Sequence, residues 1–533
     1  MSIPGFIGID IGTQGLSVLF TDEDLNVLAT GEGSYGFVTN EEQQKQGCYE
    51  QKSSDWLEAL KTAMEQIHDH FGAKQNNIQV LAIGISGQMH GEVLFDKNDQ
   101  TLEPVRLWCD ARNAAEGEEL TNIFQFKVPK RATCARFLWT VRNRPVLAEQ
   151  TRHVTTPAGW MTYMLTGEYN LGSGDAAGIF PLDSQTQNYD SALLEKYNQL
   201  IQDKSDNKIL PMEQLLPNLR RVGQDAGFLT ASGAALLGIA LHDNNKIPIA
   251  AGEGDQVAAL AGSLIGNAGT ISCSFGTSVC ANVVADPMGP PFKGVSPAVD
   301  HFTAADGKPI HMVWLRNGTT FLNTIVESYG SVLSSVRDPF AEIMPALVQA
   351  PDDCGGLLAL PFMDDEPGLG VRHGGSALIM GWNGQNRHPG HVAKAALLST
   401  IFNLKNGCEV LERQGSVEMR EIVLSGGLVK TPECGQIVAN VFNLPVTLLQ
   451  AADEGCSWGA CVMANYRHYC YRSDQPQIDW ATFLESKKTS RSSFGENARF
   501  TPQAQSVQTY EQIFQKYKQL MQIEPELRSI MSP

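Results

Sequence analysis

An acidic side chain follows a short apolar run near the middle of the chain. Residues 247–251 read as a strand, and Gly254 and Asp255 come soon after it. Proteins of the α/β class place ligand-binding groups at the carboxyl ends of their strands. A carboxylate there can accept a proton from an attacking alcohol, although an aspartate in this position is as often the N-cap of a helix. Asp255 is therefore a candidate general base, with the N-cap as its structural alternative.

Two segments far apart in the chain share a pattern that suits phosphate binding. Residues 6–22 and 270–286 each read as a strand, a tight turn with Gly-Thr, and a second strand that ends at an aspartate. The two pairs are Gly12 with Thr13 and Gly276 with Thr277. Such a turn can direct backbone N–H groups and a hydroxyl group at a phosphate. One turn alone is more often an ordinary hairpin, but two in corresponding places predict a shared phosphate site.

The first of these hairpins carries a carboxylate that the second lacks. Asp10 stands two residues before the turn glycine, where the second hairpin has Ser274. In phosphoryl transfer, Mg²⁺ prefers one or two carboxylates together with phosphate oxygens and water. Asp10 is therefore the candidate metal residue, for a Mg²⁺ ion close to the phosphates.

Three further motifs could line a binding site, and each has a simpler explanation. His90 in the sequence GQMHG could hydrogen-bond a polyol, but a single histidine is more often structural. The run from Trp108 through Asp110 to Arg112 could form a carbohydrate surface or an ordinary ion pair. The glycine pair of the SGGL motif at residues 425–428 lets a backbone approach a flat ligand such as adenine, or forms a plain turn.

Composition excludes several classes of function. No segment fits GxxxxGK[ST], so P-loop phosphoryl transfer is excluded. A net charge of −18 argues against a surface for nucleic acid or anionic lipid. The start MSIPGFIGIDIG does not resemble a signal peptide, and no run of about 18 apolar residues could span a membrane. The eleven cysteines include no CxxC pair, which predicts reduced thiols in a cytoplasmic protein.

The elements that must position these residues alternate between strands and helices. Residues 80–86 and 422–425 read as strands, whereas residues 54–67 and 391–402 read as helices. Such alternation predicts α/β layers around a sheet, and 533 residues exceed one ordinary core. We therefore expect two α/β domains around a central cleft, with the boundary near residue 264.

Taken together, the motifs resemble the FGGY family of carbohydrate kinases, and within it the xylulokinases. The resemblance runs in order from Gly8 to about residue 465 and continues more faintly into a helical tail. Its marks are GIDIGTQG, GQMHG, WCDAR, TCARFLW, LTGE, GDAAG, GEGDQ, FGTS, LPFMDDE, SGGL and EGCSWG. The resemblance implies two ribonuclease-H-like domains of the actin, Hsp70 and sugar kinase type. Residues 1–264 would bind the sugar and supply the base, and residues 265–533 would bind ATP.

The same resemblance assigns roles to individual residues. Asp255 would be the catalytic base. The sugar contacts would be Met89, His90, Asp255 and Gln256. The ATP contacts would be Gly12, Thr13, Gln14, Gly276, Thr277, Gly426 and Gly427. Asp10 would serve Mg²⁺.

The implied reaction is phosphorylation of a small ketose by ATP, with D-xylulose converted to D-xylulose 5-phosphate. Three departures bear on the sugar: Gln256 where xylulokinases usually have asparagine, a shortened stretch between Arg112 and Arg136, and an unusual segment at residues 317–320. Sedoheptulokinase and ribulokinase are the alternatives within the family. An actin- or Hsp70-like ATPase and an inactive sugar-binding regulator are the alternatives outside it. A homodimer is compatible with the sequence.

Overall fold

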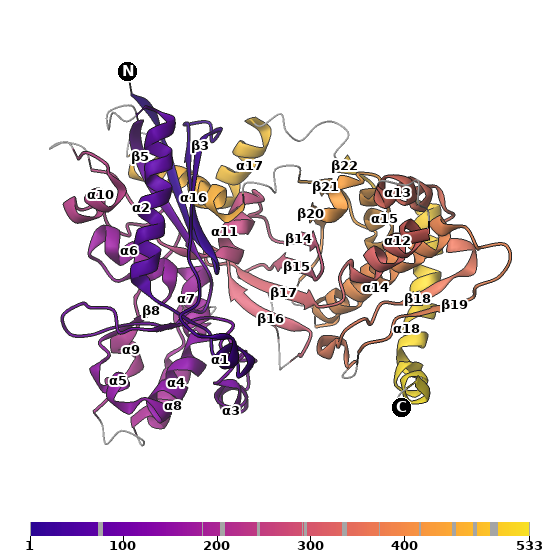
Figure 1. The fold of residues 1–533 in the computed structure, drawn as a ribbon, viewed down its shortest axis with the longest axis horizontal. Helices are drawn as coiled ribbons and strands as arrows, with labels where there is room; N and C mark the ends of the chain where they lie inside the picture. The colour runs from indigo at the N-terminus through magenta and orange to yellow at the C-terminus, as the bar shows by residue number, and fades with distance from the viewer. Residues whose placement is uncertain are drawn as a thin grey trace. The chain divides into compact units, whose positions relative to one another are not determined.

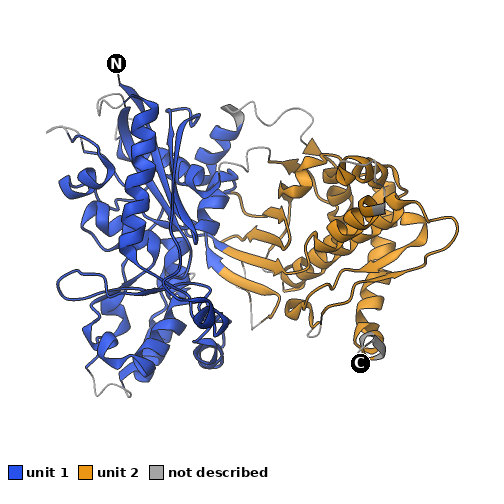
Figure 2. Ribbon diagram, viewed as in Figure 1, with its two compact units in different colours: residues 1–266, 302–309, 453–489 blue, residues 267–301, 310–452, 490–533 orange. Residues whose placement is uncertain are grey.

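The chain forms two compact units in a computed structural model. The structure describes residues 2–531 except 73–77, 184, 203–207, 242–245, 290–291, 293–295, 333–337, 372–373, 415–416, 450–454, 473–476 and 491–498. Unit 1 comprises Met1–Gly266, Phe302–Pro309 and Asp453–Thr489, and unit 2 comprises Asn267–His301, Ile310–Ala452 and Ser490–Pro533 (Figure 2).

Unit 1 is built on a five-stranded mixed sheet with the order β13-β5-β1-β2-β3 (Figure 1). Its strands are β1 (Ile3–Ile11), β2 (Gly15–Thr21), β3 (Val27–Ser34), β5 (Ile78–Gly87) and β13 (Glu253–Gly254). β2 runs antiparallel to both β1 and β3, whereas β5 is parallel to both β1 and β13. Because parallel strands end at the same edge, β1, β5 and β13 bring their carboxyl ends together.

Two helices pack against this sheet, and their contacts lie on opposite sides of β1. The apolar face of α2 (Ser53–His70) joins Ile7 and Ile9 of β1 in one core. The helix α16 (Gly455–Tyr471) lies beside the same strands although it is far away in sequence (Figure 1). A Cβ on Gly8 would lie 2.0 Å from the Ser457 carbonyl oxygen, and one on Gly84 would lie 1.8 Å from the Ala460 carbonyl oxygen. Only glycine at these two positions lets α16 approach so closely.

Unit 2 is built on a seven-stranded sheet with the order β16-β17-β15-β14-β20-β21-β22. Its strands are β14 (Thr270–Phe275), β15 (Val279–Val284), β16 (Val299–Thr303), β17 (Pro309–Leu315), β20 (Glu421–Gly426), β21 (Val446–Leu448) and β22 (Arg499–Phe500). The long helix α14 (Pro389–Arg413) is buried along most of its length in the core that includes Cys273 and Phe275 of β14.

The remaining elements surround these sheets. In unit 1 they are α1 (Glu41–Lys45), β4 (Glu50–Gln51), β6 (Val93–Phe95), β7 (Val105–Arg106), α3 (Ala114–Phe124), α4 (Thr133–Asn143), α5 (Pro145–Gln150), β8 (His153–Thr155), α6 (Pro157–Thr166), β9 (Asn170–Gly172), α7 (Ser173–Ile179), β10 (Leu182–Asp183), β11 (Asn188–Tyr189), α8 (Ser191–Gln202), α9 (Met212–Leu215), β12 (Asn218–Arg220), α10 (Ala231–Leu237), α11 (Asp255–Gly262) and α17 (Trp480–Ser490). In unit 2 they are α12 (Thr320–Val332), α13 (Pro339–Gln349), η1 (Cys354–Gly356), β18 (Leu358–Leu360), η2 (Pro367–Leu369), β19 (Leu378–Met380), η3 (Gly427–Lys430), α15 (Cys434–Phe442) and α18 (Ala504–Met531).

The predicted fold class is confirmed, because each unit is a mixed sheet packed with helices. The two predicted hairpins are β1–β2 and β14–β15, and each lies next to a parallel strand, β5 or β20. The predicted strand at residues 247–251 is reduced to isolated bridges at Pro248 and Ile249, with β13 following. Glu454 of the EGCSWG motif lies outside the described residues.

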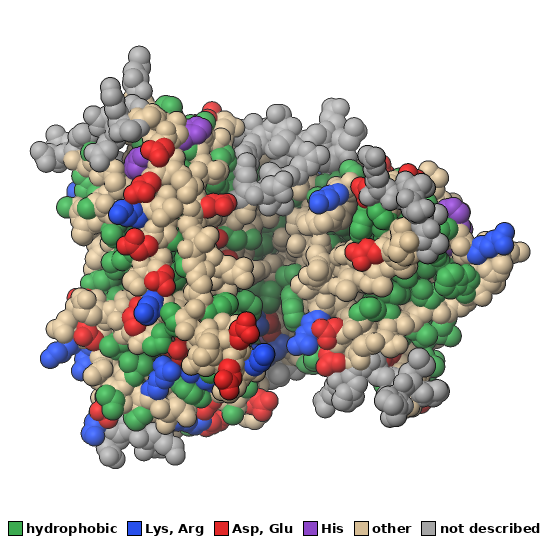
Figure 3. Space-filling model, viewed as in Figure 1, with side chains coloured by type: hydrophobic (Ala, Val, Ile, Leu, Met, Phe, Trp, Pro, Cys, Tyr) green, Lys and Arg blue, Asp and Glu red, His purple; other side chains and the backbone are tan. Residues whose placement is uncertain are grey.

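The compact units differ in extent from the predicted division of the chain. The predicted boundary near residue 264 is close to Gly266, where the first segment of unit 1 ends. Residues 302–309 and 453–489 also belong to unit 1. The sequence did not predict that these two later segments pack with the first 266 residues. Across the described residues, no helix is both long and apolar enough to cross a membrane. On the face shown in Figure 3, the coloured Lys and Arg side chains are interspersed with Asp and Glu, and neither sign forms a continuous patch.

Candidate active site

Three parallel strand ends in unit 1 bring the predicted base and the predicted metal residue to one edge of the sheet. In the strand register Asp10 of β1 lies opposite Ser86 of β5, and Ser86 in turn lies opposite Glu253 of β13. Asp255 follows β13 as the first residue of α11. The N-cap of α11 is Gly254, so Asp255 is not the N-cap that the sequence left open as an alternative.

The surroundings of Asp10 suit a ligand. Its Oδ1 atom and the Gln88 Oε1 atom are both buried without a hydrogen-bond partner among the described residues. Buried polar atoms are normally paired, so two such oxygens at one strand edge suit an additional binding partner. Burial raises the pKa of Asp10, and the neighbouring Ser86 hydroxyl lowers it in part.

The chemistry of this edge fits a Mg²⁺ ion that is completed by phosphate oxygens. No cluster of three or more His, Cys, Asp or Glu side chains that could hold a metal occurs in the described part of the chain. One carboxylate with an unsatisfied oxygen matches the sparse protein ligation that is usual for Mg²⁺ with a nucleotide.

The carboxyl group of Asp255 has the acidity of a base that works near neutral pH. Its pKa is raised to about 7, mainly by burial and then by the negative charge of Asp10. The backbone N–H of Gln256, 2.7 Å from Asp255 Oδ1, and the charge of Arg131 act in the opposite direction. Sequence reasoning missed Arg131, because nothing in its local pattern shows that it lies near the end of β13.

The first Gly-Thr turn is held rigidly from outside. The Tyr35 hydroxyl lies 2.7 Å from the Gly12 carbonyl oxygen and 2.9 Å from that of Gly15. The Gln51 amide donates to the Thr13 carbonyl oxygen at 2.7 Å. The Trp108 indole N–H donates to the Thr13 hydroxyl at 3.0 Å, although the ring is 42% exposed.

The residues near this turn include the WCDAR motif, which the sequence left open as either a carbohydrate surface or an ion pair. Gln14 is exposed, and its carbonyl oxygen accepts from the Tyr35 N–H. Asp110 is fully buried and bound to Arg106 and Arg112, so the acid and the arginine of the WCDAR motif form a structural ion network. Trp108 is the member of that motif that remains available to a ligand.

Met89 and His90 lie near Gly254 and Gly178, respectively. Met89 is buried against Gly254, where a Cβ would lie 2.2 Å from Met89 Cγ. His90 has a positive φ of 65°, and its Nδ1 atom lies 3.2 Å from the Gly178 carbonyl oxygen. Because a carbonyl oxygen only accepts, Nδ1 carries the proton in this hydrogen bond. Gln256 is the second residue of α11 and is partly exposed.

A buried arginine fixes three of these backbone positions at once. The Arg136 guanidinium donates to the carbonyl oxygens of His90, Arg131 (2.5 Å) and Trp108 (2.7 Å). Burial, followed by the charge of Arg106, lowers the Arg136 pKa to about 9. Arg136 therefore positions residues on two sides of the site, a role that its place in the TCARFLW motif did not reveal.

The remaining predicted ATP contacts lie together in unit 2. Phe275 and Gly426 are Cα partners at the ends of β14 and β20, so the turn at Gly276 and Thr277 lies beside Gly426 and Gly427. Gly426 has a φ of 83°, and a Cβ there would lie 2.5 Å from the Phe275 carbonyl oxygen. The predicted ATP residues therefore form two groups, one in each unit.

The unusual segment at residues 317–320 holds the second Gly-Thr turn. The Gly318 N–H donates to the Thr277 carbonyl oxygen at 2.9 Å, and the Thr319 N–H donates to that of Gly276 at 2.8 Å. The Thr319 hydroxyl also donates to the Gly276 carbonyl oxygen, at 2.9 Å. Sequence reasoning noted only that this segment departs from the family pattern.

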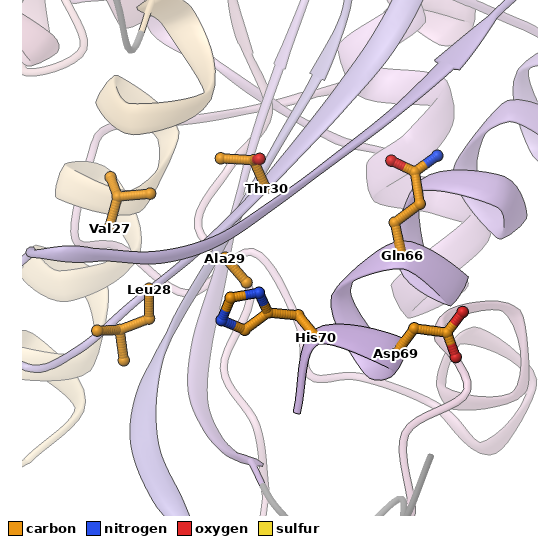
Figure 4. Close-up of a pocket in the computed structure, with 7 residues that line it drawn as sticks. All are labelled: Val27, Leu28, Ala29, Thr30, Gln66, Asp69 and His70. Atoms are coloured by element: carbon orange, nitrogen blue, oxygen red, sulfur yellow. The ribbon is translucent and has the colours of Figure 1, made fainter. Parts of the chain in front are cut away.

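A pocket of about 470 Å³ lies elsewhere in unit 1 and contains none of the predicted site residues. Val27, Leu28, Ala29 and Thr30 of β3 line one side, and Gln66, Asp69 and His70 of α2 line the other (Figure 4). The Gln66 amide is already bound to the backbone N–H and carbonyl oxygen of Glu32. This pocket is therefore not the candidate site.

The chain is similar to proteins of one family along most of its length. The model of the N-terminal domain of the FGGY family of carbohydrate kinases matches residues 6–262, and that of the C-terminal domain matches residues 271–468. A xylulose kinase of Haemophilus influenzae is 26% identical, over 96% of this chain and 98% of its own length.

Solved structures share the fold at lower identity. A Brucella ovis enzyme described as a xyloylose kinase has a TM-score of 0.76 and 22% identity, over 99% of this chain and 100% of its own. Plasmodium falciparum glycerol kinase with ADP has a TM-score of 0.76 and 18% identity, over 98% of each chain. With both domain models matched in order over most of its length, the chain belongs to the FGGY family of carbohydrate kinases and is a phosphotransferase that acts on a sugar hydroxyl group.

Proposed function

We propose that this kinase transfers the γ-phosphoryl group of ATP to a ketose, with D-xylulose as substrate and D-xylulose 5-phosphate as product. The observation that carries the proposal is Asp255, a carboxyl group with a pKa of about 7 at the strand edge that also presents Asp10. The choice of D-xylulose rests on the relatives, of which the Haemophilus influenzae protein is named a xylulose kinase.

In this reaction Asp255 is the general base. It accepts the proton of the attacking sugar hydroxyl as the oxygen bonds to the γ-phosphorus and the bond to the β,γ-bridging oxygen of ATP breaks. A base with a pKa near the working pH combines a large deprotonated fraction with sufficient basicity, and such a base contributes about 10²–10⁴-fold to the rate.

The sugar is held by the residues around His90. His90 hydrogen-bonds a sugar hydroxyl, with its ring held by the contact between Nδ1 and the Gly178 carbonyl oxygen. Met89 and Gln256 line the same site, and the exposed ring of Trp108 offers an apolar face to the sugar carbons. Residues 1–264 thus act as the sugar-binding and catalytic domain.

ATP is held mainly by residues 265–533. The phosphate contacts are Gly12, Thr13, Gln14, Gly276 and Thr277. Gly426 and Gly427 approach the adenosine, since glycine lets the backbone lie close to a flat ligand. A Mg²⁺ ion held near Asp10, directly or through water, would offset the negative charge of the β- and γ-phosphate oxygens.

Other sugars are the main alternatives to D-xylulose. Gln256, next to the base, is where a change of side chain would alter contacts with the substrate, which keeps sedoheptulose and ribulose as candidates. The shared fold of a glycerol kinase adds glycerol. A sugar-independent ATPase and an inactive regulator would both lack sugar-stimulated turnover. A homodimer and a cytoplasmic location stay predictions from the sequence.

The test is ADP release from Mg-ATP in the presence of D-xylulose, D-ribulose, L-ribulose, sedoheptulose, glycerol or no sugar. Stimulation by D-xylulose above all others supports the proposal. Stimulation by another polyol would support the same phosphoryl transfer, with that polyol in place of D-xylulose as the substrate. Turnover that no sugar alters would overturn the proposal in favour of the ATPase, and no turnover at all would favour the regulator.

A further inference from the structure

Glu253 connects β13, the strand that precedes Asp255, to the short helix α7. It lies in β13, two residues before Asp255, and is 1% exposed. Its Oε2 atom accepts from the Asp175 N–H at 2.8 Å, and its Oε1 atom accepts from the Gly174 N–H at 3.3 Å. These two groups belong to the first turn of α7, whose N-cap, Gly172, has no side chain that could cap them. The carboxyl group of Glu253 therefore caps α7 from a different element.

The fit between this carboxyl group and α7 is close. A Cβ on Gly172 would lie 2.2 Å from Glu253 Oε1, so only glycine leaves room for the glutamate there. Burial, and then the charge of Asp175, raise the Glu253 pKa well above its usual range, whereas the two N–H groups lower it. Burying a carboxyl group is expensive even when it is hydrogen-bonded, which indicates a role beyond stabilising a helix of seven residues.

The far end of α7 contacts the sugar-binding histidine. The Gly178 carbonyl oxygen is the partner of His90 Nδ1, and a Cβ on Gly178 would lie 2.5 Å from that same nitrogen. A shift of α7 would therefore alter both the orientation of the His90 ring and the nitrogen that carries its proton. The ring orientation in turn determines how His90 meets the sugar in the proposed function.

We propose that Glu253 is a positioning residue. It fixes the place of α7, and through α7 the orientation of the His90 ring, relative to Asp255. This inference rests on the proposed function, in which His90 and Asp255 act on the same sugar. It assigns a selective contribution to sugar binding to a side chain that does not itself touch the sugar.

A control for the loss of a helix cap exists in unit 2. Asp338 is the N-cap residue of α13, with its Oδ1 atom accepting from the N–H groups of Phe340 at 3.0 Å and Ala341 at 3.3 Å. It is exposed, so Asp338→Ala removes a cap without emptying a buried site. A purely structural role for Glu253 predicts that Glu253→Ala, like Asp338→Ala, lowers the melting temperature and leaves the KM for the sugar unchanged.

The experiment compares Glu253→Ala, Glu253→Gln and Asp338→Ala by thermal unfolding and by steady-state kinetics with the stimulating sugar. Glu253→Ala is expected to raise the KM for the sugar by about 10- to 100-fold, since small misplacements of binding groups have effects of this size. The KM for ATP should change little. Glu253→Gln retains an acceptor oxygen and should recover most of the sugar affinity. Asp338→Ala should lower the melting temperature without changing the KM for the sugar.

An unchanged KM for the sugar in folded Glu253→Ala would overturn the inference. If that variant does not fold, Gly178→Ala replaces it, because the added methyl group presses on His90 directly; an unchanged KM there would equally overturn it. The state of His90 gives a readout that needs no turnover. Nitrogen NMR of labelled histidine, assigned with His90→Gln, should show a protonated Nδ1 in the natural protein and in Glu253→Gln, and its loss in Glu253→Ala. Absence of sugar-stimulated turnover in the natural protein would contradict the proposed function but leave this NMR test of Glu253 intact.

Discussion

Asp10 and Asp255 stand at the ends of two strands that flank β5, and the charge of Asp10 raises the pKa of Asp255. Burial alone would already make the Asp255 carboxyl group less acidic, and the second carboxylate adds to that effect. The residue proposed to serve the metal thus also tunes the residue proposed to take the proton. Any cation beside Asp10 would weaken this coupling.

The effect of Asp10 on the Asp255 pKa predicts how the rate of sugar phosphorylation depends on pH. Asp255 must be deprotonated to act, so kcat/KM for the sugar should rise with pH through a pKa of about 7 and then level off. Asp10→Asn removes the negative charge that raises this pKa. The rising limb should therefore move to lower pH, while the plateau rate falls. If the rising part of the pH profile stayed in place or moved to higher pH, the proposed effect of the Asp10 charge on Asp255 would be contradicted.

Asp255→Asn should lower the rate of catalysis and raise the melting temperature. Loss of the base should lower kcat by about 10²–10⁴-fold and leave the affinity for ATP nearly intact, as measured by calorimetry. Because folding raises the Asp255 pKa from 3.8 to about 7, ionisation of this group opposes folding above that range. The variant should therefore melt at a higher temperature than the natural protein at pH 8, and this gain should disappear below about pH 4. Substantial residual sugar phosphorylation would exclude Asp255 as the base.

The parts of the site that the sequence predicted depend on local pattern. Asp255 could be found because it follows a strand-like run and two glycines, and strand ends carry ligand-binding groups in α/β proteins. Asp10 could be found because it is the carboxylate that distinguishes the first hairpin from the second. The two Gly-Thr turns could be found because hairpins have a recognisable turn composition. Their structural correspondence, each beside a parallel strand, agrees with that expectation.

The unpredicted parts depend on contacts between segments that are distant in sequence. Nothing near Gly8 or Gly84 shows that the backbone of α16 will lie against them. The three carbonyl partners of Arg136 come from separate loops, and Glu253 caps a helix that precedes it by many residues. A single sequence records the residue types at such positions but not which distant groups they meet.

Arg136→Lys should weaken sugar binding more than folding alone explains. The planar guanidinium reaches the carbonyl oxygens of His90, Arg131 and Trp108 together, and a lysine ammonium group cannot reproduce that geometry. We expect the KM for the sugar to rise about tenfold, which corresponds to one lost charge-assisted hydrogen bond. The control is Arg142→Lys on the same helix, because Arg142 is partly exposed and pairs with Glu119. Equal effects of the two substitutions would show that Arg136 has no special role.

The last prediction concerns the second Gly-Thr turn. The Thr319 hydroxyl donates to the Gly276 carbonyl oxygen at 2.9 Å, so Thr319→Ala should loosen the turn that is proposed to hold the phosphates. Loss of one such hydrogen bond should raise the KM for ATP about fivefold, and Thr319→Ser should restore it. Thr324→Ala is the matched control, since its hydroxyl donates to the Thr320 carbonyl oxygen at 2.9 Å within α12. An effect on the sugar KM rather than the ATP KM would place this turn with the sugar instead of the nucleotide.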